Sequence, residues 1–126
     1  MTKQLEDLFS FLRFASISTD SNHTGDVRAC AEWLVKKLDH MGLVTELHET
    51  PQHPIVVARN KHVEGKKTCL IYGHYDVQPV DPVELWDSPP FEPEIRDGRI
   101  WGRGSTDNKG QMLAHVLGVE QSLQED

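Results

Sequence analysis

Apolar residues recur at helical spacing in three stretches of the chain. The first stretch consists of Leu5, Leu8, Phe11, Leu12 and Phe14. The second consists of Val27, Cys30, Ala31, Leu34, Leu38 and Met41, and the third of Met112, Val116, Val119 and Leu123. A spacing of three or four residues between apolar positions predicts an amphipathic helix in each stretch. Gly42 directly follows the second series, where a residue in the left-handed conformation commonly ends a helix.

Between the second and third helices the pattern changes to that of strands. Residues 43–49 alternate loosely between apolar and polar side chains, and residues 55–59 form a β-branched run. Residues 61–67 contain a glycine and predict a turn. Residues 68–72 are almost continuously apolar, as expected of a central strand that is covered on both faces. Residues 94–101 predict a tight hairpin around an Asp-Gly turn.

The segment between that central strand and the hairpin carries most of the prolines. Five of the seven prolines fall within residues 77–93. Proline lacks a backbone N–H group and fixes φ, so we predict an irregular loop there. Its aromatic residues, together with the last residue of the hairpin, are expected to pack the loop; they are Trp86, Phe91 and Trp101.

Composition indicates one globular domain and excludes several kinds of partner. The 126 residues include 20 acidic and 13 basic side chains, a formal net charge of −7. The basic residues form no stripe that could follow phosphates, so we expect no nucleic acid partner. No apolar run approaches the roughly 20 residues that span a bilayer, so we expect no membrane partner and a cytoplasmic location. Cys30 and Cys69 are interpreted as reduced thiols in the core.

Two short sequence motifs contain residues that could bind a metal. His74 and Asp76 follow the predicted central strand, at the edge where ligands gather in open α/β sheets. A carboxylate at this spacing can hold an imidazole so that the other ring nitrogen faces a metal. A solvated pair at the start of a loop is the alternative. Asp107 lies between a glycine-rich turn and the third helix, where it could cap the helix or bridge two cations.

The basic residues near Asp107 and the other histidines are assigned no role in chemistry. Arg103 and Lys109 flank Asp107 and are expected to be solvated surface charges. The other histidines have no ligand-like spacing and stay unassigned; they are His23, His40, His48, His53, His62 and His115.

The order of these motifs along the chain resembles that of the M20 family of metallopeptidases. This family groups carboxypeptidase G, carnosinase-like dipeptidases, aminoacylase and succinyl-diaminopimelate desuccinylase. The resemblance extends over residues 68–118 and rests on three segments: Tyr-Gly-His-Tyr-Asp-Val-Gln-Pro at 72–79, Trp-Asp-Ser-Pro-Pro-Phe-Glu-Pro at 86–93, and Asp-Gly-Arg-Ile-Trp-Gly-Arg-Gly-Ser-Thr-Asp-Asn-Lys-Gly at 97–110. Residues 77–79 are most similar to the dipeptidase branch.

The resemblance implies an α/β fold that is incomplete in this chain. Residues 1–126 would be the N-terminal portion of a catalytic domain, an α/β/α sandwich with a mixed sheet, without the dimerisation domain and the remaining catalytic segment. It also implies that His74 binds one Zn²⁺ ion, that Asp107 bridges two, and that the catalytic residue Asp76 orients His74. The Asp107–Asn108 peptide bond would be cis. The complete protein would be a homodimer that hydrolyses dipeptides or short peptides through an activated water bridging the two ions.

Several alternatives stay open. Mn²⁺ or Co²⁺ could replace Zn²⁺ at such nitrogen and oxygen ligands. The substrate could be an N-acyl amino acid, or the chain could be a non-catalytic binding partner. The general base and further ligands of the family lie downstream of the Asp107 helix, and Glu120 and Glu125 follow Asp107 too closely to be assigned. Zinc catalytic sites keep at least three protein ligands, so we expect the isolated chain to bind zinc weakly and to be inactive.

Overall fold

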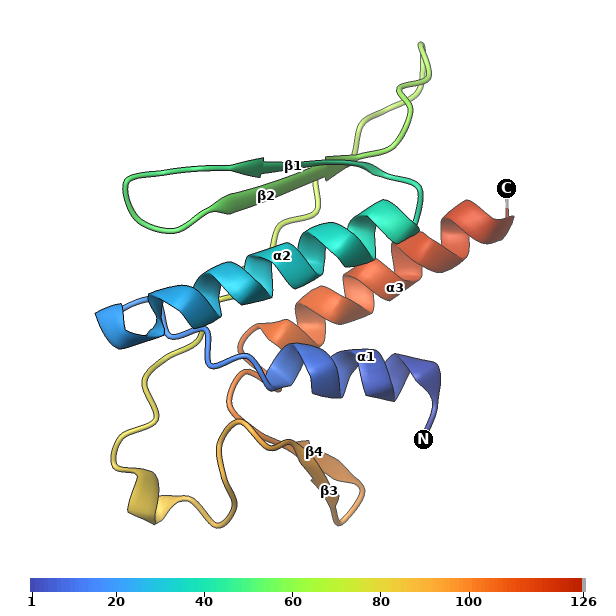
Figure 1. Ribbon diagram of the computed structural model, residues 1–126. Coiled ribbons are helices and arrows are strands. Elements are labelled where there is room, and N and C mark those ends of the chain that lie inside the picture. Colours follow the sequence, from blue (N-terminus) through green and yellow to red (C-terminus); the bar gives the residue numbers. More distant parts are fainter. Residues whose placement is uncertain (126) are drawn as a thin grey trace.

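Three helices form the body of the molecule in the computed structural model, which describes residues 1–125. They are α1 (Lys3–Leu12), α2 (Thr24–His40) and α3 (Lys109–Glu125). Figure 1 shows the β1–β2 hairpin beside α2 and the small β3–β4 hairpin at the opposite end, beyond α1. The three helices predicted from periodicity are confirmed.

One apolar core joins the three helices. Its fully buried members are Phe11 of α1, Cys30 and Leu34 of α2, and Leu113 of α3. The ring of Phe11 stacks on Trp33, with 5.1 Å between the ring centroids. Burial of these side chains supplies the main stabilisation, at about 25 cal/mol per Å² of apolar surface. The α3 residue that enters the core is thus Leu113, which the predicted apolar series of this helix did not contain.

The predicted hairpin at residues 94–101 is confirmed, and the two predicted strand-like stretches before it form a second hairpin. Strands β1 (Val44–His48) and β2 (Ile55–Arg59) pair antiparallel, as do β3 (Glu94–Arg96) and β4 (Arg99–Trp101). Asp97 and Gly98 join the latter pair with φ angles of 51° and 70°, the positive values that a tight hairpin turn requires.

The predicted ends and loops agree with the structure in most places. Gly42 follows α2 with φ at 85°, the left-handed conformation expected there. Helix α1 ends at Leu12, so Phe14 lies beyond it and packs against Trp33 from the following loop. Single 3-10 turns occur at η1 (Ser21–His23) and η2 (Val83–Leu85). The second is the one regular element within the proline-rich stretch 77–93.

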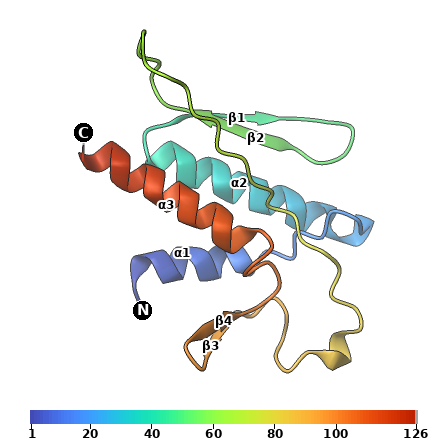
Figure 2. The same ribbon diagram turned by 180° about the vertical axis from the view of Figure 1, so that it is seen from behind.

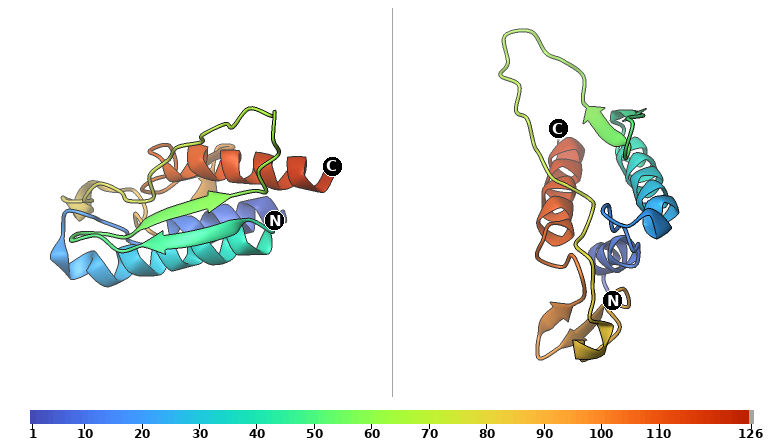
Figure 3. Two further views of the ribbon diagram at one scale, coloured as in Figure 1. Left: turned by 90° about the horizontal axis from the view of Figure 1, so that it is seen from above. Right: turned by 90° about the vertical axis from the view of Figure 1, so that its left-hand side faces the viewer.

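The predicted central strand at residues 68–72 is not formed. This segment runs as an extended chain past β2 and α3 (Figures 2 and 3), without a partner strand among residues 1–125. Leu70 and Tyr72 are 91% and 81% exposed. A strand requires hydrogen bonds to a neighbour, and no other described segment supplies them here. The prediction that Cys69 is a core thiol is wrong for the same reason, since Cys69 is exposed whereas Cys30 is buried.

The chain therefore has an incomplete α/β fold. Two helices, four strands and a third helix follow one another along the sequence. Within the described residues the strands form two separate two-stranded antiparallel sheets. One isolated parallel bridge, between Ile17 and Val77, joins the segment after α1 to the segment that carries His74. None of the described helices has the length and apolar character needed to cross a membrane.

Candidate functional site

His74 and Asp76 meet although they do not lie on a strand. His74 Nδ1 is 3.0 Å from Asp76 Oδ1 and 3.2 Å from the Asp76 backbone oxygen. Both oxygens are acceptors, so we assign the ring proton to Nδ1, from which it is donated to Asp76. The lone pair of Nε2 is then directed away from Asp76 and is free to bind a cation.

Asp107 lies on the other side of the His74 ring. Its Oδ1 is 3.2 Å from His74 Nε2, and its side chain is 77% exposed. Within residues 1–125, the Asp107 carboxylate accepts no hydrogen bond from a backbone N–H group of α3, so the alternative of a helix cap is not realised. The carboxylate instead faces the imidazole nitrogen.

The contact between His74 and Asp107 brings together two groups that both carry lone pairs. A neutral imidazole nitrogen and a carboxylate oxygen repel each other unless a proton or a cation lies between them. Zn²⁺ binds nitrogen and oxygen ligands at about 2.0–2.2 Å, so two donors separated by less than about 4 Å can bind one ion. The separation of 3.2 Å satisfies this condition. The donor set therefore fits a divalent cation.

The described residues supply only part of such a site. Within residues 1–125, no group of three or more His, Cys, Asp or Glu side chains is arranged to hold a metal ion. His74 and Asp107 are two ligands, and a catalytic zinc ion usually has three from the protein. The roles of His74 and Asp107 as ligands, and of Asp76 as the residue that orients His74, stay predictions.

Asn108 connects the two halves of the site. Its Oδ1 accepts a hydrogen bond of 3.2 Å from the backbone N–H group of His74. The Asp107–Asn108 peptide bond is cis, in agreement with the prediction from the resemblance. The turn before α3 is thus joined to the backbone of the residue that would bind the metal.

Tyr75 fixes the loop from its other side. Its hydroxyl donates a hydrogen bond of 2.5 Å to the backbone oxygen of Pro54, at the start of β2. Burial raises the pKa of Tyr75 to about 12, so the hydroxyl keeps its proton at neutral pH. The side chain therefore acts as an anchor for the loop between His74 and Asp76.

The prediction of a solvated surface charge is wrong for Lys109, whereas Arg103 is half-buried. Lys109 is fully buried, and its Nζ donates hydrogen bonds of 3.0 and 2.9 Å to the backbone oxygens of Phe11 and Phe14. These carbonyls lie at and after the C-terminal end of α1, where helical partners are lacking. Burial lowers the pKa of Lys109. Arg103 donates to the backbone oxygen of Pro79 and lies over the Trp86 ring, 5.0 Å from its centroid.

Sequence reasoning did not identify Ser18 as a neighbour of the site. Its Oγ is 2.5 Å from Asp76 Oδ2, although the two residues are 58 positions apart. Ser18 belongs to a polar stretch typical of loops, and nothing in its local sequence indicates its partner.

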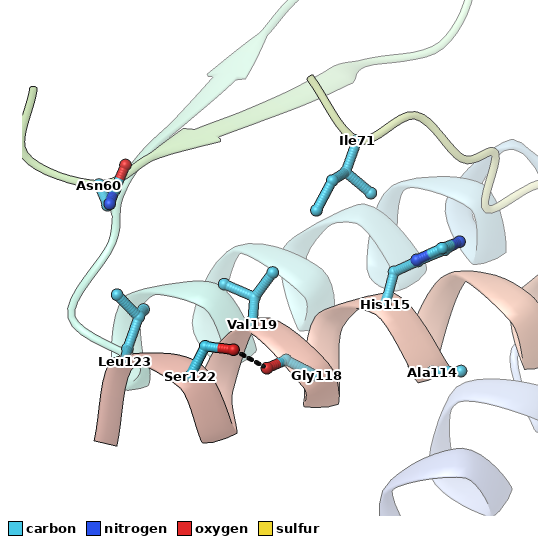
Figure 4. A pocket seen from close by; sticks show the side chains of 8 residues that line it. All are labelled: Asn60, Ile71, Ala114, His115, Gly118, Val119, Ser122 and Leu123. Atoms are coloured by element: carbon cyan, nitrogen blue, oxygen red, sulfur yellow. Dashed lines mark hydrogen bonds between the residues drawn. The ribbon is translucent and has the colours of Figure 1, made fainter. Parts of the chain in front are cut away.

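A hollow lies along α3, away from His74, Asp76 and Asp107. It has a volume of about 500 Å³ and is open to solvent. Figure 4 shows its lining, in which Ile71 from the extended segment lies across from Val119 and Leu123 of α3. Ile71 is the one residue of segment 68–72 in this lining, which contains none of the candidate metal ligands.

Comparisons with known proteins agree on one family. Residues 70–126 match the family described as Peptidase family M20/M25/M40. A succinyl-diaminopimelate desuccinylase from Acidovorax ebreus is 38% identical over 110 residues, which cover 79% of this chain and 28% of the relative. An M20 family metallo-carboxypeptidase from Sulfolobus solfataricus superposes with a TM-score of 0.89 and 36% identity, over 99% of this chain and 28% of that one.

A dipeptidase structure is also similar. Human carnosine dipeptidase 1 superposes with a TM-score of 0.87 and 25% identity, over 97% of this chain and 28% of the human chain. The chain thus spans little more than a quarter of the length of the relatives it matches. Its backbone nevertheless occurs almost whole within them.

Proposed function

Because this chain belongs to the M20 family of peptidases, which are generally metal-dependent hydrolases, we propose that it forms part of a metal centre that hydrolyses an amide bond. The observation that carries the proposal is the contact of His74 Nε2 with Asp107 Oδ1 at 3.2 Å, in which two atoms with lone pairs, both able to bind a metal, face each other. His74 and Asp107 would hold the metal. The remaining ligands and the general base would come from another part of the complete protein, the part that corresponds to the portion of the relatives that this chain does not span.

The residues of this chain would position the metal rather than attack the substrate. Asp76 accepts the Nδ1 proton of His74 and so keeps Nε2 available as a ligand. Asp107 offers two carboxylate oxygens, enough to contact two ions. When bound, divalent cations would polarise the amide carbonyl and lower the pKa of water. We propose Zn²⁺ as the metal, two ions per complete site, with Mn²⁺ or Co²⁺ as alternatives.

The proposed substrate is a dipeptide or short peptide. The superposition on human carnosine dipeptidase 1 supports this choice, as does the Val-Gln-Pro sequence after Asp76. An N-acyl amino acid is the second candidate, and the similarity to succinyl-diaminopimelate desuccinylase favours it. We further propose that the complete protein is a cytoplasmic homodimer.

The test uses the complete protein that carries this segment, loaded with Zn²⁺. His74→Ala and Asp107→Asn are expected to lower kcat by at least 10³-fold and to weaken Zn²⁺ binding in a competition with a chromophoric chelator. His62→Ala and Asp39→Asn are matched controls on exposed positions and should leave both values within twofold. Unchanged zinc affinity in either site variant would refute the assignment. Faster turnover of N-succinyl amino acids than of dipeptides would select the second substrate class.

A further inference from the structure

We propose that Ser18 is a positioning residue for the metal ligand His74 and that it acts through Asp76. This inference rests on the proposed metal centre and extends it by one residue. Two hydrogen bonds link three groups in a row: the Ser18 hydroxyl, the Asp76 carboxylate and the His74 imidazole.

The hydrogen bonds give each oxygen of Asp76 one partner. Ser18 Oγ donates to Asp76 Oδ2 at 2.5 Å, and His74 Nδ1 donates to Asp76 Oδ1 at 3.0 Å. A hydrogen bond to a carboxylate is short and about twice as strong as a neutral one. With Oδ2 engaged by the hydroxyl, Oδ1 stays directed at the imidazole.

The backbone around Ser18 is held firmly enough to aim the hydroxyl. Ser16, which is fully buried, donates through Oγ to the backbone oxygen of Tyr75 at 2.7 Å. The N–H group of Val77 donates to the Ser16 oxygen at 2.9 Å, and Ile17 and Val77 form the parallel bridge described above. Segment 16–18 therefore lies alongside segment 75–77.

A second contact holds Ser18 from the side of the β1–β2 hairpin. The imidazole of His53 lies with Nε2 2.8 Å from the Ser18 backbone oxygen. His53 lies in the turn between the two strands. Ser18 is therefore held both by the hairpin and by the segment after α1. The hydroxyl is thus presented by a braced backbone, whereas the Asp76 side chain is 41% exposed and would otherwise be free to rotate.

Loss of the hydroxyl should weaken metal binding without removing a ligand. Changes to groups that orient a metal-bound histidine typically cost 10- to 100-fold in affinity. We expect Ser18→Ala in the complete protein to weaken Zn²⁺ binding by that factor, measured by competition with a chelator. Ser18→Thr keeps the hydroxyl and should stay within about threefold of the wild type. Thr19→Ala, on the exposed neighbour, is the matched control and should bind as the wild type does.

A double-mutant cycle separates positioning from general destabilisation. In the Asp76→Ala background, Ser18→Ala should have no further effect on zinc affinity, because the residue through which it acts is gone. Equal losses in both backgrounds would overturn the proposal, as would wild-type affinity in Ser18→Ala. If Ser18→Ala does not fold, Ser18→Cys, with its weak donor, replaces it and should bind Zn²⁺ more weakly than Ser18→Thr does; equal affinity in these two variants would then overturn the proposal. Failure of the proposed function is distinguishable, since His74→Ala would then also leave zinc affinity unchanged.

Discussion

Gly110 lies in the first turn of α3, three residues after Asp107, and it has no room for a side chain. A Cβ atom at this position would lie 2.0 Å from the backbone oxygen of Ser105 and 3.1 Å from its carbonyl carbon. The opposing atoms belong to the backbone, so no side-chain rotation can relieve the overlap. The turn that carries Asp107 would have to move by more than about 1 Å to reach an ordinary carbon–oxygen contact.

The magnitude follows from two opposing effects of Gly110→Ala. Alanine favours a helix interior over glycine by about 1 kcal/mol. Overpacking against atoms that cannot yield costs about 1–3 kcal/mol, and this close overlap falls at or beyond the upper end. We therefore expect a net loss of about 2 kcal/mol in the free energy of unfolding. Gly118 in the same helix is the matched control, since a Cβ there meets nothing within 4 Å. Gly118→Ala should stabilise the chain by about 0.5–1 kcal/mol.

Urea unfolding of the 126-residue chain, followed by circular dichroism at 222 nm, measures both variants. The reasoning requires opposite signs for two identical substitutions in one helix. If Gly110→Ala were as stabilising as Gly118→Ala, the close approach of α3 to Ser105 would be refuted, and with it the described geometry of the turn that carries Asp107.

Two further predictions concern a bridging lysine and the two thiols. Lys37 of α2 donates hydrogen bonds to Asp7 and Glu120 at 3.0 and 3.1 Å. Burial alone would lower the pKa of Lys37, but these hydrogen bonds outweigh burial and raise it above 10.5. Lys37→Met should lower the free energy of unfolding by about 1–3 kcal/mol at neutral pH. This difference from the wild type should shrink as the pH rises past 10.5, because the stabilisation ends when the ammonium group of Lys37 deprotonates in the folded state. Cys69 is exposed, whereas Cys30 is buried with a pKa raised by burial, so a thiol reagent should modify Cys69 at once and Cys30 only on unfolding.

Controls for these two predictions come from the same elements. Lys36→Met changes an exposed neighbour on α2 and should alter the free energy of unfolding by less than about 0.5 kcal/mol. A pH-independent deficit in Lys37→Met would contradict the ion-pair explanation. Equal modification rates for both thiols in the folded chain would contradict the described burial.

Sequence reasoning succeeded where the determining interactions are local. The apolar series from Val27 to Leu34 found the buried face of α2, and Asp97-Gly98 found the hairpin turn, because spacing and φ preference are properties of a few adjacent residues. The motif around His74 and Asp107 found the two facing donors through the order of residues alone.

It failed where the partner is distant in the sequence or where residues 1–125 supply none. Residues 68–72 carry the composition of a covered strand, but a strand forms only against a neighbour. Lys109 has the composition of a surface residue, yet its acceptors are the carbonyls at the end of α1. Ser18 meets Asp76 across 58 positions for the same reason. In each case the local pattern states what a residue can do, and the topology decides whether it does.

The buried ammonium of Lys109 makes the N-terminal helix part of the candidate site. Its two acceptors, the oxygens of Phe11 and Phe14, lie 98 and 95 positions before it. A translation start downstream of Phe14 would remove both acceptors and leave a buried charge without them, two residues from Asp107. Such a shortened chain would keep every residue of the His74–Asp107 motif and lose the support of the turn that presents it. The first fourteen residues, which contain neither His74 nor Asp107, thus support the turn on which Asp107 lies.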